Sequence, residues 1–417
     1  MSETPHPLTI HRLSEAKTFN EAVAVWMDHA DELSGYMFVL SSPETAGGPL
    51  WPPRLDLAGK GHLRSLFAHP RLWFVSHEIL EAMTGPRGKV VLPIDYSIAF
   101  DTNAASYLRA MVEGSAVEVV QVFQQVLRQM AGRRFNWDLM PFFSERSADL
   151  QSGESKALEG IWRTVLAAER FATCDMERFA ETGEIKPRLR EQEIVAKAQE
   201  QLSLWDSMLK AGIACSLREQ HRLFYLMALK VALLEHQHPG RSEAERKMTA
   251  FITFLQKDVS AMFLNMLWAA GRYFQDGGGF RPFSKLASRG EQLLRNAANV
   301  AWDLHHVTMR RQFAGTIGRG GAFYVPYFLS FDGGLTDLID GYPQRSCLVR
   351  SGSFPQFFAD LDMQAWLLEN WHQPTELLMQ CFSIEGHQER KERHKKQGPT
   401  NPEPIIARFE AEIRALG

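Results

Sequence analysis

Two apolar stretches, far apart in the chain, each end abruptly at an aspartate. The first spans residues 89–103 and reads KVVLPIDYSIAFDTN; the second spans residues 323–335 and reads FYVPYFLSFDGGL. A short apolar run bounded by polar or turn residues is typical of a strand buried on both faces. The pattern therefore predicts two buried strands that end at Asp101 and Asp332.

Helical periodicity dominates most of the remaining chain. After Asp101 the pattern predicts one helix that Gly114 closes and a second from about Ala116 to Met130. Residues 150–275 lack strand signals and are rich in helix-forming residues, so they are expected to form several amphipathic helices. The longest of these expected helices are Glu191–Ala211, Leu217–His236, Glu243–Gln275 and, before the second strand, Ser288–Phe313.

The two ends of the chain are less regular. Residues 1–88 are mixed, with short helices expected at Phe19–Leu33 and Ser76–Met83 and a loop at Ser41–Arg54, and they carry no functional signal. A third strand is expected at Ser346–Arg350, and the tail from about Gln356 is expected to be helical and partly basic. Strands that alternate with helices indicate the α/β class.

Composition narrows the class of protein. The chain has 417 residues, a length that suggests two or three structural units. Of these residues 45% are hydrophobic, which is enough apolar material for a folded core. Its formal net charge of -3 means that any contact with nucleic acid would need a local basic surface. The four cysteines are scattered, the N-terminus has no apolar signal core, and no apolar stretch is long enough to span a membrane. We therefore expect a soluble, cytoplasmic protein without a membrane partner.

Three aspartates carry the candidate chemistry. Ligands of parallel α/β sheets sit outside the carboxyl ends of the strands, so Asp101 and Asp332 can meet at one edge. Asp303 lies on the long helix beside apolar positions, where an unpaired charge is costly. Converging carboxylates repel unless a cation lies between them, and Mg²⁺ or Mn²⁺ prefers such oxygen ligands. Metal-activated water could then hydrolyse a phosphate ester.

The strings FDTNAASYL, AWDLHH and VPYFLSFDGGLTDL, in this order, resemble the PIN-like nuclease family. The resemblance covers residues 89–150 and 285–352. It implies an α/β fold with a PIN-like parallel sheet core, interrupted by a large α-helical insertion at residues 151–284 and followed by a tail at 353–417. It also implies a metal-dependent nuclease that prefers RNA to DNA, in which Asp101, Asp303 and Asp332 are catalytic metal ligands supported by Asn103. Glu145 matches the remaining acidic position by spacing, and Glu235 is its rival.

Each of these residues also has an ordinary structural explanation. Asp101 could cap a helix, Asp332 could belong to a turn, and Asp303 could pair with Arg310 or Arg311. If all three were structural, the chain would be a non-catalytic helical scaffold or partner-binding protein. A third hypothesis is that the chain is a different metal-dependent phosphoesterase. A nuclease of this kind could be a toxin, a defence effector or a processing enzyme, and the sequence does not choose among them.

Candidate nucleic-acid contacts are basic residues outside the acidic set. The run His387–Lys396 holds five Lys or Arg against two Glu, which is typical of a solvated helix face but also fits contact with a phosphate backbone. The residues assigned to this role are Lys391, Arg393, Lys395, Arg133, Arg134 and Arg319. The helical insertion is the expected surface for a protein partner or for homo-oligomer formation.

Overall fold

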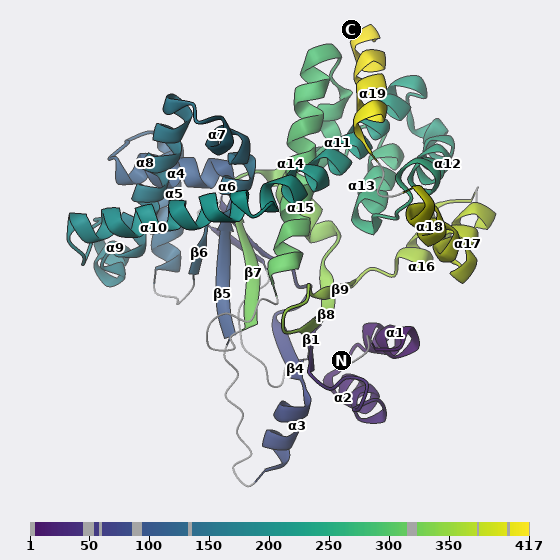
Figure 1. Cartoon of the computed structure of the whole chain (residues 1–417), viewed down its shortest axis with the longest axis horizontal. Helices are drawn as coiled ribbons and strands as arrows, with labels where there is room; N and C mark the ends of the chain where they lie inside the picture. The colour runs from purple at the N-terminus through teal and green to yellow at the C-terminus, as the bar shows by residue number, and fades with distance from the viewer. Residues whose placement is uncertain are drawn as a thin grey trace. The chain divides into compact units, whose positions relative to one another are not determined.

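The computed structural model of the chain describes residues 5–44, 54–57, 61–85, 94–131, 136–314, 323–372, 375–397 and 401–416. The chain forms two compact units (Figure 1). Unit 1 consists of Met1–Ser216, Thr308–Asp332 and Pro343–Asp360, and unit 2 consists of Leu217–Val307, Gly333–Tyr342 and Leu361–Gly417. The α/β class is confirmed, but the units divide the chain differently from the expected core, insertion and tail.

A five-stranded mixed sheet forms the centre of unit 1, in the order β2-β3-β7-β5-β6. Its parallel part is β5, with β7 on one side and β6 on the other, whereas β3 pairs with β7 and β2 with β3 in antiparallel fashion. The expected parallel sheet is therefore present only in three of the strands. The bounds are β2 Arg54–Leu57, β3 Gly61–Ser65, β5 Ile94–Phe100, β6 Asn136–Asp138 and β7 Phe323–Ser330.

A second sheet in unit 1 is antiparallel, with the order β4-β1-β8-β9. The expected strand at Ser346–Arg350 is confirmed as part of β8, but it joins this sheet and not the parallel strands. The expected helical tail was wrong at its start, because residues 356–359 form the edge strand β9. The bounds are β1 Tyr36–Ser42, β4 Arg71–Val75, β8 Gln344–Arg350 and β9 Gln356–Ala359.

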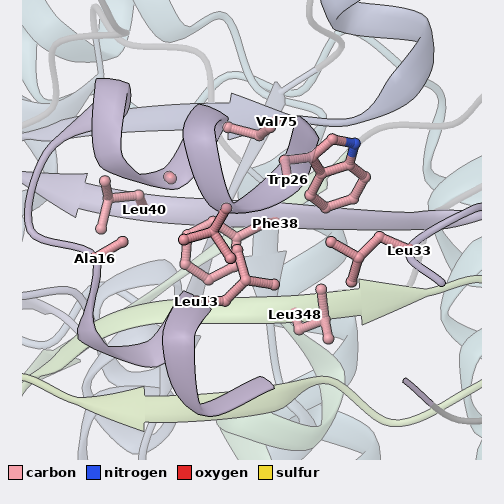
Figure 2. Packing of buried hydrophobic residues seen from close by; sticks show 10 residues of the cluster. Leu13, Ala16, Trp26, Leu33, Phe38, Leu40, Val75 and Leu348 are labelled. Atoms are coloured by element: carbon pink, nitrogen blue, oxygen red, sulfur yellow. The ribbon is translucent and has the colours of Figure 1, made fainter. Parts of the chain in front are cut away.

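Helices α1 (Pro7–Glu15) and α2 (Phe19–Asp28) pack their apolar side chains on the antiparallel sheet (Figure 2). Trp26 of α2 is only 1% exposed and packs in one cluster with Phe38 of β1 and Leu348 of β8. Thr18 begins α2 with a reciprocal capping box to Glu21, which satisfies two N–H groups. The first 88 residues thus build part of the core of unit 1.

The other helices of unit 1 pack in two places: α4, α5 and α6 contact strands of the mixed sheet, whereas α3 contacts β4 of the antiparallel sheet. The predictions of a helix after Asp101 and of another ending at Met130 are confirmed by α4 and α5. Helix α8 packs against both α4 and α10, so part of the expected insertion belongs to unit 1. The bounds are α3 His77–Thr84, α4 Thr102–Val112, α5 Glu118–Met130, α6 Met140–Glu145, α7 Ser147–Ser152, α8 Ser155–Ala172, α9 Met176–Thr182 and α10 Glu191–Lys210.

Unit 2 is helical throughout its described residues. The single helix expected at Glu243–Gln275 is interrupted by a π turn at Leu255–Val259, after which Ser260 takes a φ of 57°. None of the described helices is both long enough and apolar enough to cross a membrane. The bounds are α11 Ile213–Gln237, α12 Ala244–Phe254, α13 Leu264–Gln275, α14 Gly290–Phe313, α15 Gly333–Gly341, α16 Met363–Asn370, α17 Thr375–Phe382, α18 Ile384–Gln397 and α19 Glu403–Ala415, with 3-10 turns at Arg241–Glu243 and Arg281–Ala287.

A buried arginine ties the last turns of α14 to the mixed sheet within unit 1. Arg310 is 3% exposed, and its guanidinium donates to the Asp138 carboxylate at the end of β6. It also donates to the Ser97 carbonyl at 3.1 Å and to the Ser97 hydroxyl at 3.0 Å in β5. The ion pair and these hydrogen bonds offset the cost of burying the charge. Arg310 therefore fixes the helix end against two adjacent strands.

We expect Arg310→Met to lower the free energy of unfolding of unit 1 by about 3 kcal/mol, because it leaves Asp138 without its cation. Chemical denaturation measures this loss. Arg178→Met is the matched control, since Arg178 pairs with Glu184 on the surface and its side chain is 46% exposed. That variant should lose less than about 1 kcal/mol. Equal losses in the two variants would contradict the role assigned to Arg310.

Candidate active site at the ends of β5 and β7

Asp101 and Asp332 follow two strands that are neighbours in the mixed sheet. β5 and β7 pair in parallel from Ile94–Phe323 to Phe100–Leu329, so their carboxyl ends lie at the same edge. Both aspartates belong to unit 1. Two of the four predicted acids therefore meet where ligands bind in open α/β sheets.

The buried carboxylate of Asp101 begins α4. One oxygen accepts a hydrogen bond from the Ala104 N–H at 2.6 Å, so Asp101 is the N-cap of the helix. Capping was the structural alternative to a catalytic role for this residue. The side chain is only 7% exposed. Capping accounts for one carboxylate oxygen and leaves the other available for a second interaction.

A single serine links the two aspartates. The Ser330 hydroxyl donates to the second oxygen of Asp101 at 3.0 Å and accepts from the backbone N–H of Asp332 at 2.9 Å. Ser330 itself is 1% exposed. It therefore orients the Asp101 carboxylate and sets the chain direction as β7 turns toward Asp332.

Phe331, between Ser330 and Asp332, is held in an aromatic cluster. Its ring lies 5.6 Å from that of Tyr107 in α4 and 5.7 Å from that of Phe123 in α5. A Cβ on Gly61 would come within 3.2 Å of the Phe331 ring and 2.7 Å of Val126, so only glycine fits there without movement. This packing fixes the backbone that carries Asp332.

The burial of Asp101 and its nearness to Asp332 favour the binding of a proton or a cation. Burial is the main reason that the pKa of the Asp101 carboxyl rises to about 6, and the nearby Asp332 carboxylate raises it further. The hydrogen bonds from Ala104 and Ser330 oppose this rise without cancelling it. A divalent cation near both carboxylates would offset their repulsion, and hard oxygen ligands suit Mg²⁺ or Mn²⁺.

Two further polar residues in this sheet, His62 and Asp56, were not predicted from the sequence. His62 in β3 is directly opposite Ser330 of β7, so their side chains point to the same face of the sheet. The His62 Nδ1 lies 2.7 Å from the Asp56 carboxylate, which orients the imidazole. Only the antiparallel pairing of β3 with β7 reveals these residues, because neither stands in a recognisable motif.

The other two predicted acids lie on other elements, Asp303 on α14 and Glu145 on α6. Asp303 belongs to unit 2, where its carboxylate lies 3.3 Å from Lys285 Nζ. Glu145 is the last residue of α6 in unit 1, and Asn103 is exposed in the first turn of α4. In the described part of the chain, no three His, Cys, Asp or Glu side chains are grouped closely enough to hold a metal ion.

The alternative and supporting residues have other contacts. Glu235, the rival to Glu145, pairs with the fully buried Lys247 at 2.6 Å in unit 2. Arg310, considered as a partner of Asp303, instead binds Asp138. In α18, Arg393 donates to the Gln256 carbonyl, whereas Lys391 and Lys395 are exposed. The predicted nucleic-acid contacts Arg133, Arg134 and Arg319 lie outside the described residues.

We expect Asp101→Asn to stabilise unit 1 at pH 8 by about 3 kcal/mol, which follows from a rise in pKa from 3.8 to about 6. The folded protein holds the Asp101 proton more tightly than the unfolded chain does. This tighter binding of the proton therefore stabilises unit 1 below pH 4, and the stabilisation is lost as the pH rises through 6. Because the asparagine amide does not ionise, the variant should not show this loss. Melting temperatures at pH 4.5 and pH 8 measure the difference.

Asp175→Asn is the matched control, because Asp175 caps α9 with a side chain that is 36% exposed, and its ionised form is stabilised by hydrogen bonds. This variant should be neutral or slightly destabilised at pH 8. Destabilisation of Asp101→Asn at pH 8 would contradict the strain assigned to the buried carboxylate.

Comparison with known proteins does not assign the chain to a family. No family model, curated protein or solved structure matches the chain.

Proposed function

We propose that the protein is a metal-dependent nuclease that hydrolyses phosphodiester bonds, with RNA as the preferred substrate. The observation that carries the proposal is the meeting of Asp101 and Asp332 at the carboxyl ends of two adjacent parallel strands. The preference for RNA and the assignment to a PIN-like core rest on the sequence resemblance.

Asp101 and Asp332 would hold Mg²⁺ or Mn²⁺. The donor set suits such an ion, because it consists of carboxylate oxygens that repel each other without a cation, and Mg²⁺ commonly keeps several waters as its remaining ligands. When bound, the metal supplies positive charge beside the scissile phosphate and lowers the pKa of water. In this proposal Asp303 and Glu145 are further ligands that come from the resemblance.

The protein's own groups have separate roles. Asp101 must be ionised to bind a cation, although its burial favours the neutral form. Ser330 holds one Asp101 oxygen, so the remaining lone pairs have a fixed direction. The Phe331 cluster keeps Asp332 at a constant position relative to Asp101. These constraints favour a preorganised site.

We expect purified protein to cleave mixed single-stranded RNA and DNA in Mn²⁺ and not in EDTA. Asp101→Asn and Asp332→Asn should each lose at least about 100-fold in rate, whereas Asp175→Asn should retain the activity, because it changes a cap of the same type away from the strand ends. Metal-independent cleavage, or full activity in both strand-end variants, would contradict the proposal.

Binding of the metal can be measured apart from cleavage. Mg²⁺ or Mn²⁺ at about 100 times its dissociation constant should stabilise the protein by about 2.7 kcal/mol, and both strand-end variants should lose this effect. If metal stabilises the wild type but no nucleic acid is cleaved, nucleotide substrates would test a related phosphoesterase. If metal has no effect and each Asp→Asn change destabilises the protein, the alternative hypothesis of a non-catalytic scaffold or partner-binding protein is correct.

Ser330→Ala should shift the acid limb of the pH–rate profile to higher pH. The Ser330 hydroxyl lowers the pKa of Asp101, so its loss should raise the pH at which Asp101 ionises. The profile of kcat/KM between pH 5 and pH 8 measures this shift, with little change expected on the alkaline plateau. An unchanged profile would mean that Ser330 does not position the reacting carboxylate.

A further inference from the structure

A cleft follows the outer side of β6, at the opposite side of β5 from β7. It consists of two adjoining cavities of about 830 and 460 Å³, both within unit 1, which share Trp137, Leu139, Glu169 and Gln201. We call it the β6 cleft. Its lining residues belong to β5 and β6 of the sheet and to α6, α8, α9 and α10, which are labelled in Figure 1. A cavity of this size holds a small organic molecule.

Glu169 is the group in the cleft that most needs a ligand. Its side chain lines both cavities, and the residue is only 9% exposed. Among the described residues, no donor forms a hydrogen bond or an ion pair with its carboxylate. Burial raises the pKa of Glu169, and the nearby Glu200 adds to this rise, whereas Lys197 opposes it. The carboxylate faces the cleft, and a cation bound there would stabilise its charged form.

The remaining charges also favour a cationic ligand. Asp95 and Glu177 line the larger cavity, and Glu200 lines the smaller one. The basic residues are fewer among the described lining residues: Arg188 already pairs with Asp175 at 3.1 Å, and Lys197 is exposed. The negative charge of these described residues favours a cation over a phosphate group.

The spacing of the carboxylates argues against a compact metal ion. Mg²⁺ and Ca²⁺ need several oxygen ligands within about 2.6 Å of one point. The described residues contain no set of three acidic, His or Cys side chains close enough for that. Carboxylates spread along a cleft instead match a ligand whose positive charges are separated.

Part of the lining of the cleft is apolar. Trp137 packs its ring against Phe100 at 4.9 Å and Phe171 at 5.4 Å, which holds it at the shared boundary of the two cavities. Leu139 and Ala168 add further apolar surface. Methylene groups fit such a surface, and an ammonium group beside an indole gains additional stabilisation.

We propose that the β6 cleft binds a linear aliphatic polyamine, with one ammonium group paired to Glu169 and the methylene chain against Trp137 and Leu139. The remaining ammonium groups lie toward Asp95, Glu177 or Glu200. This site is separate from the strand-end aspartates and does not depend on the proposed nuclease activity.

Titration calorimetry with spermidine tests this proposal. The intact chain should bind one spermidine with saturable heat, and Glu169→Gln should bind it about 10- to 100-fold more weakly, as expected for loss of a charged hydrogen bond. The change is isosteric and removes a buried charge, so a melting curve should show the variant folded and at least as stable. Spermidine should raise the melting temperature of the wild type and not that of the variant.

Glu159→Gln is the matched control, because Glu159 is exposed on the same helix and does not line the cleft. It should bind spermidine as the wild type does, whereas Glu177→Gln at the rim should lose affinity only a few-fold. Absence of saturable binding, or equal binding by Glu169→Gln, would overturn the proposal. Tighter binding of tetralysine than of spermidine would also overturn it, in favour of a basic peptide.

Discussion

The parallel pairing of β5 with β7 is the constraint on which the candidate site depends. It joins residues such as Asp101 and Ser330, which are 229 positions apart, and a parallel pair always needs a long crossover connection. Closing so long a loop has an entropic cost that the buried apolar residues of both strands must offset. The two aspartates therefore become neighbours only when the core of unit 1 has formed.

Several independent contacts hold that edge of the sheet. Ser330 joins the two aspartates, Phe331 packs between α4 and α5, and Arg310 links α14 to β5 and β6. The geometry keeps a carboxylate buried beside another, although this arrangement raises the pKa of Asp101 to about 6. Such local strain is common at functional sites, because it is relieved when the ligand binds.

Unit 1 carries two regions of different chemistry that share one strand, β5. Asp101 stands buried at the carboxyl end of β5 near Asp332, where we propose that a small hard cation binds. Asp95, near the start of the same strand, faces a wide cleft in which carboxylates are spread apart. The arrangement of acidic groups therefore distinguishes the two proposed ligands: neighbouring carboxylates suit a metal ion, and carboxylates on several elements suit an extended organic cation.

The sequence by itself determined the buried strands ending at Asp101 and Asp332, the helices that follow Asp101, and the mostly helical character of residues 150–275. These features depend on local hydrophobic period and capping, which can be read within a short window. Only the tertiary structure decided that β8 and β9 form a separate antiparallel sheet, that Arg310 binds Asp138, and that Glu169 lies unpaired in a cleft. Strand order and the partners of buried charges depend on contacts between distant residues, and no local pattern records those contacts.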